Sequence, residues 1–288
     1  MKKTLKTLLI ACFALLVSVL VFAACTAPTS PHTHTVVIRE AIAPTYDKTG
    51  LTAGAYCSTC GEVLVAQEIV PATGSVGLSY TVNADKTTCT ITGIGTCRDT
   101  KINIPRRIHG YKVIGIDKSA FSNCENITSV TLPNSVIAIG ERAFSYCKNL
   151  TSVTISDSVI TIGKSAFASC PNLTSVTIGD SVTVIGDSAF WDCPSLTSIT
   201  IPNSVTVIGE GVFHRCSKLT SITIPHTVTS IGKGAFQYCS KLTSITFEGT
   251  RQQWNSVYKG DHWNYSTGNY TVYCTDCTIA KNGTITEK

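Results

Sequence analysis

Three residue types recur in this chain at a constant spacing of 23 residues. Glycines keep this step from Gly140 to Gly232, and five complete units run from Ile127 to Lys241. A fixed period of about 20 to 50 residues is typical of solenoids, in which each unit stacks on the next. We therefore predict a solenoid. The phenylalanines of the period are Phe121, Phe144, Phe167, Phe190, Phe213 and Phe236, and its cysteines are Cys124, Cys147, Cys170, Cys193, Cys216 and Cys239.

One unit, Leu150 to Asn172, indicates how the repeat folds. Val153 and Ile155 alternate with threonine, as in a half-buried strand. A second short apolar stretch ends at the glycine of the repeat, where the chain is able to turn. Phe167 and Cys170 are expected to lie in a single helical turn that points into the core. One unit buries too little apolar surface to offset the entropy of ordering it, so stacked neighbours are needed.

The repeat pattern L-T-S-[VI]-T-I-P-x-S-V-x-x-I-G-x-x-A-F-x-x-C is clearest from Leu196 to Cys216. It resembles the BspA-like, or Treponema pallidum-type, leucine-rich repeats of bacterial surface proteins, and the resemblance covers Ile104 to Phe247. The resemblance implies a protein that binds host matrix proteins or other cells, and it does not imply an enzyme. We expect a β-dominated α/β repeat: a leucine-rich-repeat solenoid of about seven 23-residue coils with a β-hairpin N-cap and an aromatic/β C-cap.

The first 24 residues resemble an export signal. Three lysines precede an uncharged run, Leu8 to Ala24, which is shorter than the roughly 20 residues of a transmembrane helix. Phe22-Ala-Ala-Cys25 resembles a lipoprotein lipobox, in which Cys25 would be lipidated and become the mature N-terminus. We expect an exported protein held at the cell surface by this lipid. An uncleaved anchor and ordinary secretion are the alternatives.

The charge of the chain excludes one class of partner. The formal net charge is +5, and removal of the three signal lysines lowers it to +2. No cluster of Lys and Arg follows, so nucleic-acid binding, which rests on a concentrated basic patch, is not expected. With 43% hydrophobic residues and this low net charge, the chain is not intrinsically disordered.

The chain outside the repeats is expected to form caps and a small module. The pattern over 79–91 predicts a hairpin that turns at Asn83 to Lys86 and covers the first coil. Trp254 and Trp263 are expected to form a hydrophobic lid, with a sugar platform as the alternative. The residues around Cys57 and Cys60 resemble a small CxxCG module. The predicted organisation is 1–24 signal peptide, 25–44 tether, 45–75 CxxCG module, 76–106 N-terminal cap, 107–247 leucine-rich-repeat solenoid, and 248–288 C-terminal cap and tail.

The chain has 14 cysteines, which in an exported protein favours disulfides. The six periodic cysteines share one slot, where parallel side chains suit a disulfide poorly, so we expect buried thiols that pack like small hydrophobes. Six equivalent copies also argue against a catalytic nucleophile. Cys57 and Cys60 are the metal candidates, because a CxxC pair supplies two zinc ligands and His32 and His34 could supply two more. A disulfide, unpaired thiols and redox chemistry are the alternatives there, and no other cofactor is expected.

The two residues between each Phe and Cys vary more than any other position of the repeat. Exposed aromatic residues and Arg dominate protein interfaces, so this edge is a candidate binding surface. The alternative is a set of unconstrained solvent positions. The strand face instead carries an almost invariant ladder of Thr and Ser, which we interpret as a solvated β-surface, with a template for glycan or ice as the alternative. The predicted binding ridge consists of Tyr146, Trp191, His214, Arg215 and Tyr238.

These features predict a lipid-anchored surface protein whose solenoid mediates protein–protein binding or adhesion to host matrix or other cells. The expected partner is an extracellular or host protein, and the membrane is contacted through the lipid anchor only. The alternative is a structural spacer that presents the CxxCG module. An exported enzyme or a glycan binder is less favoured, because the sequence has no phosphate-binding loop and no catalytic set outside the repeated positions. No catalytic residue is predicted.

Overall fold

The computed structural model describes residues 35–42, 50–67, 69–70 and 74–288 of the chain. The chain divides into two compact units, Met1–Thr73 and Gly74–Lys288, and each is described by itself. The predicted signal peptide, Cys25 and the two candidate histidines lie outside the described residues. Among the residues that are described, no helix has the length and apolar character needed to span a membrane.

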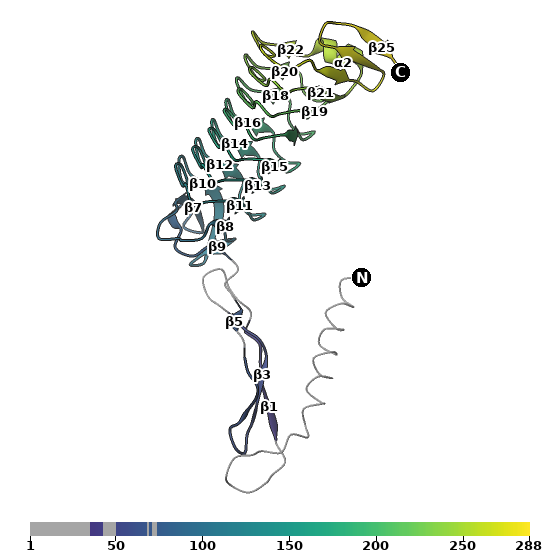
Figure 1. Cartoon of the computed structure of the whole chain (residues 1–288). Helices are drawn as coiled ribbons and strands as arrows, with labels where there is room; N and C mark the ends of the chain where they lie inside the picture. Colours follow the sequence, from purple (N-terminus) through teal and green to yellow (C-terminus); the bar gives the residue numbers. More distant parts are fainter. Residues whose placement is uncertain (1–34, 43–49, 68, 71–73) are drawn as a thin grey trace. The chain divides into compact units, whose positions relative to one another are not determined.

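The second unit is a β-dominated solenoid of about eight turns, which confirms the predicted fold class (Figure 1). One face is a parallel sheet of short strands. Each strand pairs with the equivalent strand of the next coil, so that Ile162, for example, pairs with Ile185, 23 residues later. A hairpin at the N-terminal end completes this sheet. In spatial order its strands are β22 (Tyr258–Lys259), β20 (Ser230–Ile231), β18 (Val207–Ile208), β16 (Val184–Ile185), β14 (Thr161–Ile162), β12 (Ala138–Ile139), β10 (Tyr111–Ile116), β7 (Thr88–Gly93) and β6 (Ser79–Val82).

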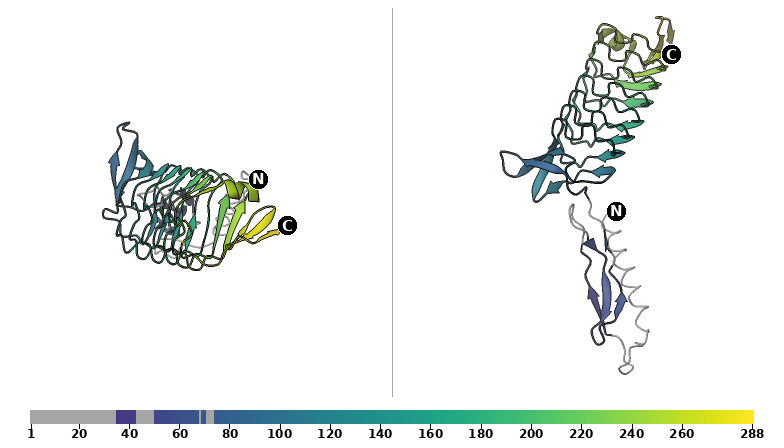
Figure 2. Two further views of the ribbon diagram at one scale, coloured as in Figure 1. Left: turned by 90° about the horizontal axis from the view of Figure 1, so that it is seen from above. Right: turned by 60° about the vertical axis from the view of Figure 1, so that its left-hand side comes forward.

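A second column of parallel strands lies on another face, and Figure 2 shows its strands stacked from coil to coil. Ser152 pairs with Ser175, again one repeat apart. This column is split into two separate sheets. The first contains β8 (Lys101–Asn103), β11 (Ser129–Thr131), β13 (Ser152–Thr154) and β15 (Ser175–Thr177), and the second contains β17 (Ser198–Thr200), β19 (Ser221–Pro225), β21 (Ser244–Glu248), β23 (Thr271–Tyr273), β24 (Cys277–Ala280) and β25 (Ile285–Glu287).

The break between β15 and β17 leaves an open crevice of about 350 Å³. At neighbouring junctions the Thr174 amide donates to the Thr151 carbonyl and the Thr220 amide to the Thr197 carbonyl, both at 2.9 Å. Within the described coils, the Thr197 amide makes no such bond to Thr174. The turn side stays closed at the same junction, because the Phe190 amide donates to the Val212 carbonyl at 3.0 Å. The solenoid is therefore opened on its strand face only.

The third face consists of tight turns, and the helical turn expected around Phe167 is not formed. Ser165 and Ser169, on either side of Phe167, have φ angles of 54° and 56°, in the left-handed region that an α-helix excludes. The Phe167 amide donates to the Ala189 carbonyl of the next coil at 2.8 Å instead of forming a helical bond. The expectation was wrong because every second amide of this segment donates to the next coil, and only the amides between them, such as that of Ala166, which donates to the Gly163 carbonyl at 3.2 Å, bond within the turn.

The core contains a continuous stack of the periodic phenylalanines, all fully buried. Their ring centroids are 5.0 to 5.7 Å apart, and the rings are within 12° of parallel. The periodic cysteines are not disulfide-bonded, and five of the six are buried, as predicted, whereas Cys124 in the first coil is partly exposed. The Cys170 thiol donates to the Phe144 carbonyl at 3.2 Å, a contact that repeats in the other coils. The repeated residues therefore form one shared apolar interior.

Both ends of the solenoid are capped. The predicted hairpin is confirmed as β6 and β7, which pair antiparallel, and β7 joins the coils through β10. A second short strand, β9 (Arg107–Ile108), folds back on β10 and pairs antiparallel with it. At the other end, α2 (Arg251–Ser256) places Trp254, which is 5% exposed, 5.2 Å from the Phe247 ring. Trp263 packs edge-on against Phe236 at 6.1 Å, so the tryptophans form the expected lid.

The first unit contains two small sheets in its described part. One is three-stranded and antiparallel, with the order β1 (Val36–Arg39), β3 (Gly54–Cys57) and β4 (Val63–Val65). The other pairs β2 (Gly50–Leu51) with β5 (Ile69–Val70). Strand β1 falls within the expected tether, 25–44. The tether prediction is therefore wrong for these four residues, because their backbone groups pair with β3.

Candidate binding surface

The predicted binding ridge lies on the turn face, directly after each buried phenylalanine. Each coil contributes the two residues between its phenylalanine and its cysteine. The second of these two residues has a left-handed backbone in every coil, with φ angles of 59° at Tyr146, 63° at Arg215 and 61° at Tyr238. Asn and Asp tolerate this conformation, and bulkier residues adopt it at a cost of about 1 kcal/mol or more. Large side chains at these positions therefore oppose local backbone preference, which is a pattern seen at functional sites.

Four of the five ridge residues form one cluster. The Trp191 ring stacks on the His214 ring with centroids 6.2 Å apart and an interplanar angle of 5°. The His214 ring meets the edge of Tyr238 at 5.4 Å, and the Arg215 guanidinium carbon lies 5.9 Å from the Tyr238 ring centre. Tyr146 is exposed in the same column, but Ser169 and Asp192 occupy the positions between it and Arg215. The structure does not bring Tyr146 into the cluster.

Tyr265 extends the cluster by one coil and was not predicted. Its ring lies 5.9 Å from Tyr238, edge to face, and its carbonyl accepts the Tyr238 amide hydrogen bond. The stacked glycines of these two coils, Gly232 and Gly260, are 28 residues apart instead of 23. The five extra residues, at α2, shift Tyr265 out of the sequence period. The break in the glycine spacing was the one signal that could have located it.

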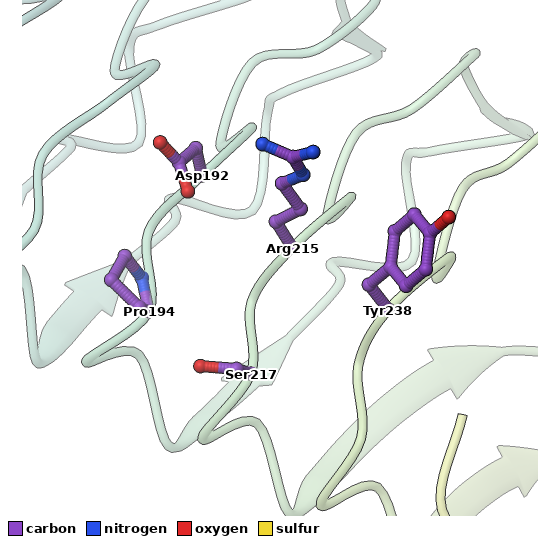
Figure 3. Close-up of a pocket in the computed structure, with 5 residues that line it drawn as sticks. All are labelled: Asp192, Pro194, Arg215, Ser217 and Tyr238. Carbon is purple, nitrogen blue, oxygen red and sulfur yellow. The ribbon is translucent and has the colours of Figure 1, made fainter. Parts of the chain in front are cut away.

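A shallow depression of about 300 Å³ lies beside the cluster. Figure 3 shows its lining, in which Asp192, Arg215 and Tyr238 come from three successive coils. Pro194 and Ser217 complete the lining. Arg215 is exposed and supplies a positive charge at the edge of this depression, near the Asp192 carboxylate. The depression therefore offers an aromatic wall together with one charge of each sign.

His214 is the titratable residue in the middle of the cluster. Burial, and then the neighbouring Arg215, lower the pKa of His214 below its usual value, so its ring is neutral at pH 7. Its Nδ1 atom is buried and makes no hydrogen bond within the described residues. A neutral ring stacks on Trp191 without bringing a charge into the aromatic cluster.

The hydroxyl ladder of the strand face is engaged in hydrogen bonds along the solenoid. The Thr151 hydroxyl donates to the Thr128 carbonyl at 2.9 Å, and Thr174, Thr220 and Thr243 repeat this bond at 3.0 to 3.2 Å. These hydroxyls satisfy the carbonyls of the coil before them. The arrangement supports the interpretation of this face as a structural β-surface.

The two candidate metal ligands of the first unit sit at a strand end and a turn. Cys57 is the last residue of β3 and is buried, whereas Cys60 is exposed. The turn is closed by the Gly61 amide, which donates to the Cys57 carbonyl at 2.8 Å. In the described ranges, no third His, Cys, Asp or Glu completes a metal-binding group with them. Zinc at Cys57 and Cys60 stays a prediction, since His32 and His34 lie outside those ranges.

The two columns of parallel strands, the turn column and the shared apolar interior define a leucine-rich-repeat solenoid. Residues 114–243 match the family model for the BspA type Leucine rich repeat region, in six copies. This region of the chain therefore consists of BspA-type leucine-rich repeats. No curated protein matches the chain.

Solved structures of bacterial leucine-rich repeat proteins resemble the chain. The Treponema pallidum leucine-rich repeat protein is 26% identical, with a TM-score of 0.45, over 65% of this chain and 96% of that protein. A leucine-rich repeat protein from Bacteroides ovatus is 23% identical, with a TM-score of 0.42, over 69% of this chain and 70% of that protein.

Proposed function

We propose that the chain is a lipid-anchored protein of the bacterial cell surface that binds another protein through one edge of its solenoid. The proposal rests on the cluster of Trp191, His214, Arg215, Tyr238 and Tyr265. This cluster has the composition of an interface core, in which tryptophan, tyrosine and arginine supply most of the binding energy. The role proposed for the solenoid is non-catalytic.

Two further observations support a binding role. The BspA-type repeats of residues 114–243 are consistent with protein–protein binding. The periodic thiols suit packing better than nucleophilic chemistry, because burial raises the pKa of Cys193 and of Cys239 to about 12. The proposed partner is an extracellular or host protein, such as a matrix protein or a component of another cell. Export and the anchor at Cys25 are proposed from the lipobox resemblance.

The test is binding of the purified chain to immobilised fibronectin, to fibrinogen and to whole bacteria. Where binding is found, we expect Trp191→Ala and Arg215→Ala each to raise the Kd about tenfold or more. Arg215 is exposed, so its substitution should leave the urea midpoint unchanged. Tyr258→Ala is the matched control, because Tyr258 is 66% exposed on β22 and belongs to no part of the cluster.

Equal affinities for the wild-type chain and both cluster variants would remove the ridge as the binding site. Binding that survives in Trp191→Ala and Arg215→Ala but is lost in Cys57→Ser or Cys60→Ser would instead assign binding to the CxxCG module. The solenoid would then serve as a spacer.

A further inference from the structure

The C-terminal cap contains a pair of facing cysteines that the proposed binding function does not use. In the hairpin of β23 and β24, Tyr273 pairs with Thr278, so the next pair is Cys274 and Cys277. The Cys274 amide donates to the Cys277 carbonyl at 2.9 Å. Only Thr275 and Asp276 lie between them. This tight loop holds both thiols on the same side of the hairpin.

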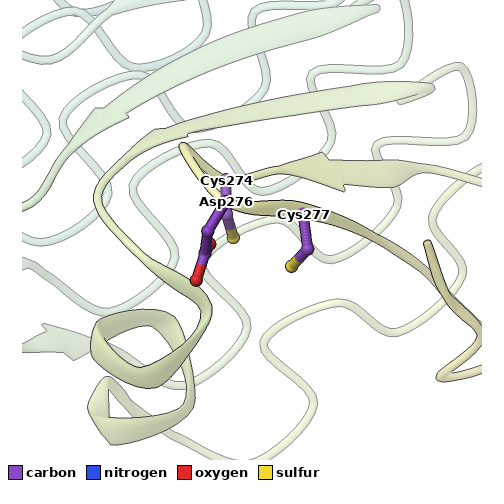
Figure 4. Close-up of side chains that lie close together, drawn as sticks. All are labelled: Cys274, Asp276 and Cys277. Atoms are coloured by element: carbon purple, nitrogen blue, oxygen red, sulfur yellow. The ribbon is translucent and has the colours of Figure 1, made fainter. Parts of the chain in front are cut away.

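Three potential metal ligands converge at this loop. The two thiol sulfurs and a carboxylate oxygen of Asp276 all lie within 4.8 Å of one another (Figure 4). Cys274 is 1% exposed and Cys277 is fully buried, whereas Asp276 faces solvent. Across the part of the chain that the structure describes, this is the one group of three such residues. The distances suit ligands around a single ion, whose bonds to sulfur and oxygen are about 2.0 to 2.3 Å long.

The Asp276 carboxylate is held in place by the neighbouring helix. Its Oδ1 atom accepts a hydrogen bond from the Arg251 amide, the first residue of α2, at 2.8 Å. An ionised carboxylate has about four lone-pair sites, so this hydrogen bond leaves Asp276 able to act as a ligand. The Thr275 amide also donates to the Gly249 carbonyl, which ties the loop to the chain before α2. The ligand set is therefore fixed to two elements of the cap.

We propose that Cys274, Asp276 and Cys277 bind a zinc-like divalent transition metal ion, with water as the fourth ligand on the exposed side. Two thiolates and one carboxylate form a soft, anionic donor set that favours zinc over magnesium or calcium. The complex would carry one net negative charge. The Lys288 ammonium, which donates to the Cys274 carbonyl, is placed to balance that charge.

Metal binding at this site must displace thiol protons. A thiol must lose its proton to bind a metal ion, so each metal–thiolate bond that forms releases one proton. Affinity should rise with pH for this reason. The ion would fix the loop of the hairpin, which the Asp276–Arg251 hydrogen bond holds against α2, and so would stabilise the C-terminal cap.

The experiment is a Co²⁺ titration of the reduced full-length chain, in a Cys57→Ser and Cys60→Ser background that removes the other CxxC pair. We expect one equivalent of Co²⁺ to produce a thiolate-to-cobalt charge-transfer band, which Zn²⁺ then abolishes. Cys277→Ser should weaken binding by about 100-fold or more, and Asp276→Asn by about tenfold. Asp276→Asn keeps the acceptor for the Arg251 amide, so the loop should stay folded.

Thr275→Ala in the same loop is the matched control and should bind as the parent does. A second readout is the melting temperature, which Zn²⁺ should raise in the parent and in Thr275→Ala but not in Cys277→Ser. Absence of the charge-transfer band would overturn the proposal, and so would equal affinities in Asp276→Asn, Cys277→Ser and the control. A Cys274–Cys277 disulfide that persists when the chain is purified with Zn²⁺ would also overturn it. None of these outcomes bears on the ridge, which is tested by protein binding.

Discussion

At the scale of single residues, the periodic cysteines are explained by two contacts. Each packs in the apolar interior, and each thiol from Cys147 onward donates to the carbonyl of a phenylalanine 26 residues earlier, at 3.1 to 3.2 Å. A thiol is small and only weakly polar, so it fills this position and satisfies a carbonyl at little desolvation cost. The role of these cysteines is therefore structural.

These thiols make stability depend on alkaline pH. Burial raises the pKa of Cys193 from 9.0 to about 12 in the folded chain. As the pH rises, the Cys193 thiol of the unfolded chain therefore loses its proton before that of the folded chain. The protonated, buried thiol contributes its full stabilisation of the folded state below pH 9, and this contribution declines as the pH rises toward 12. Each such thiol lowers the free energy of unfolding by about 1.4 kcal/mol per pH unit within that window. Urea denaturation at several pH values measures the slope.

Cys193→Ala should reduce the decline in the free energy of unfolding per pH unit by the contribution of one buried thiol. Cys60→Ala, at an exposed position of the first unit, should leave it unchanged. A slope identical in all three proteins would contradict the burial argument.

The sequence was enough to predict which side chains are buried, because their apolar character and their period decide this. Burial of Phe167 and Cys170 follows from apolar character and period. The backbone around them was predicted wrongly, because Ser165 and Ser169 have left-handed φ angles although neither is a glycine. The available signal was at the repeat position of Ser165, which is glycine in two later coils, at Gly211 and Gly234. Tyr265 was missed for a related reason, since five extra residues at α2 move it out of the repeat.

At the scale of elements, the junction between β15 and β17 is the weak point of the solenoid. The short-strand sheet also thins there, with Ile185 and Ile208 as its single registered pair. The Phe190 and Phe213 rings at this junction are 5.7 Å apart, the widest spacing in the stack. The sequences LTSVTI and LTSITI on its two sides are almost the same, so the repeat pattern could not indicate that this junction opens.

Hydrogen exchange should detect this junction directly. We expect the Thr197 amide to exchange at least about tenfold faster than those of Thr174 and Thr220, which occupy the same position in the adjacent coils and donate to carbonyls at 2.9 Å. Comparable protection of all three amides, measured by NMR or mass spectrometry, would show that the crevice is closed in solution.

At the scale of the whole molecule, the chain consists of two units with separate interiors. The 23-residue period, the strand pattern over 79–91 and the aromatic C-terminal pattern were enough to predict the solenoid and both of its caps. The period has no bearing on the first unit, which lies outside the repeats, and strand β1 was not predicted. Its sequence, VVIR, is short, and its partner β3 belongs to the module that was predicted to be separate from the tether.

The solenoid should fold without the first unit. A fragment of residues 74–288 keeps the hairpin cap, every coil and the tryptophan lid, so its urea midpoint should equal that of the solenoid transition in the full chain. Circular dichroism of both proteins measures the two midpoints. A fragment that is unfolded or clearly less stable would show that the first unit contributes to the solenoid interior.

The crevice between β15 and β17 also has a mechanical consequence. Pulling along a stack of coils loads the backbone hydrogen bonds between neighbouring strands, and at this junction one of the two strand ladders is missing. Force applied through the ends of the solenoid would separate the coils there first, while Phe190 and Val212 still hold the turn side together. A solenoid built in this way would yield to shear by bending at one defined place before any coil unravels.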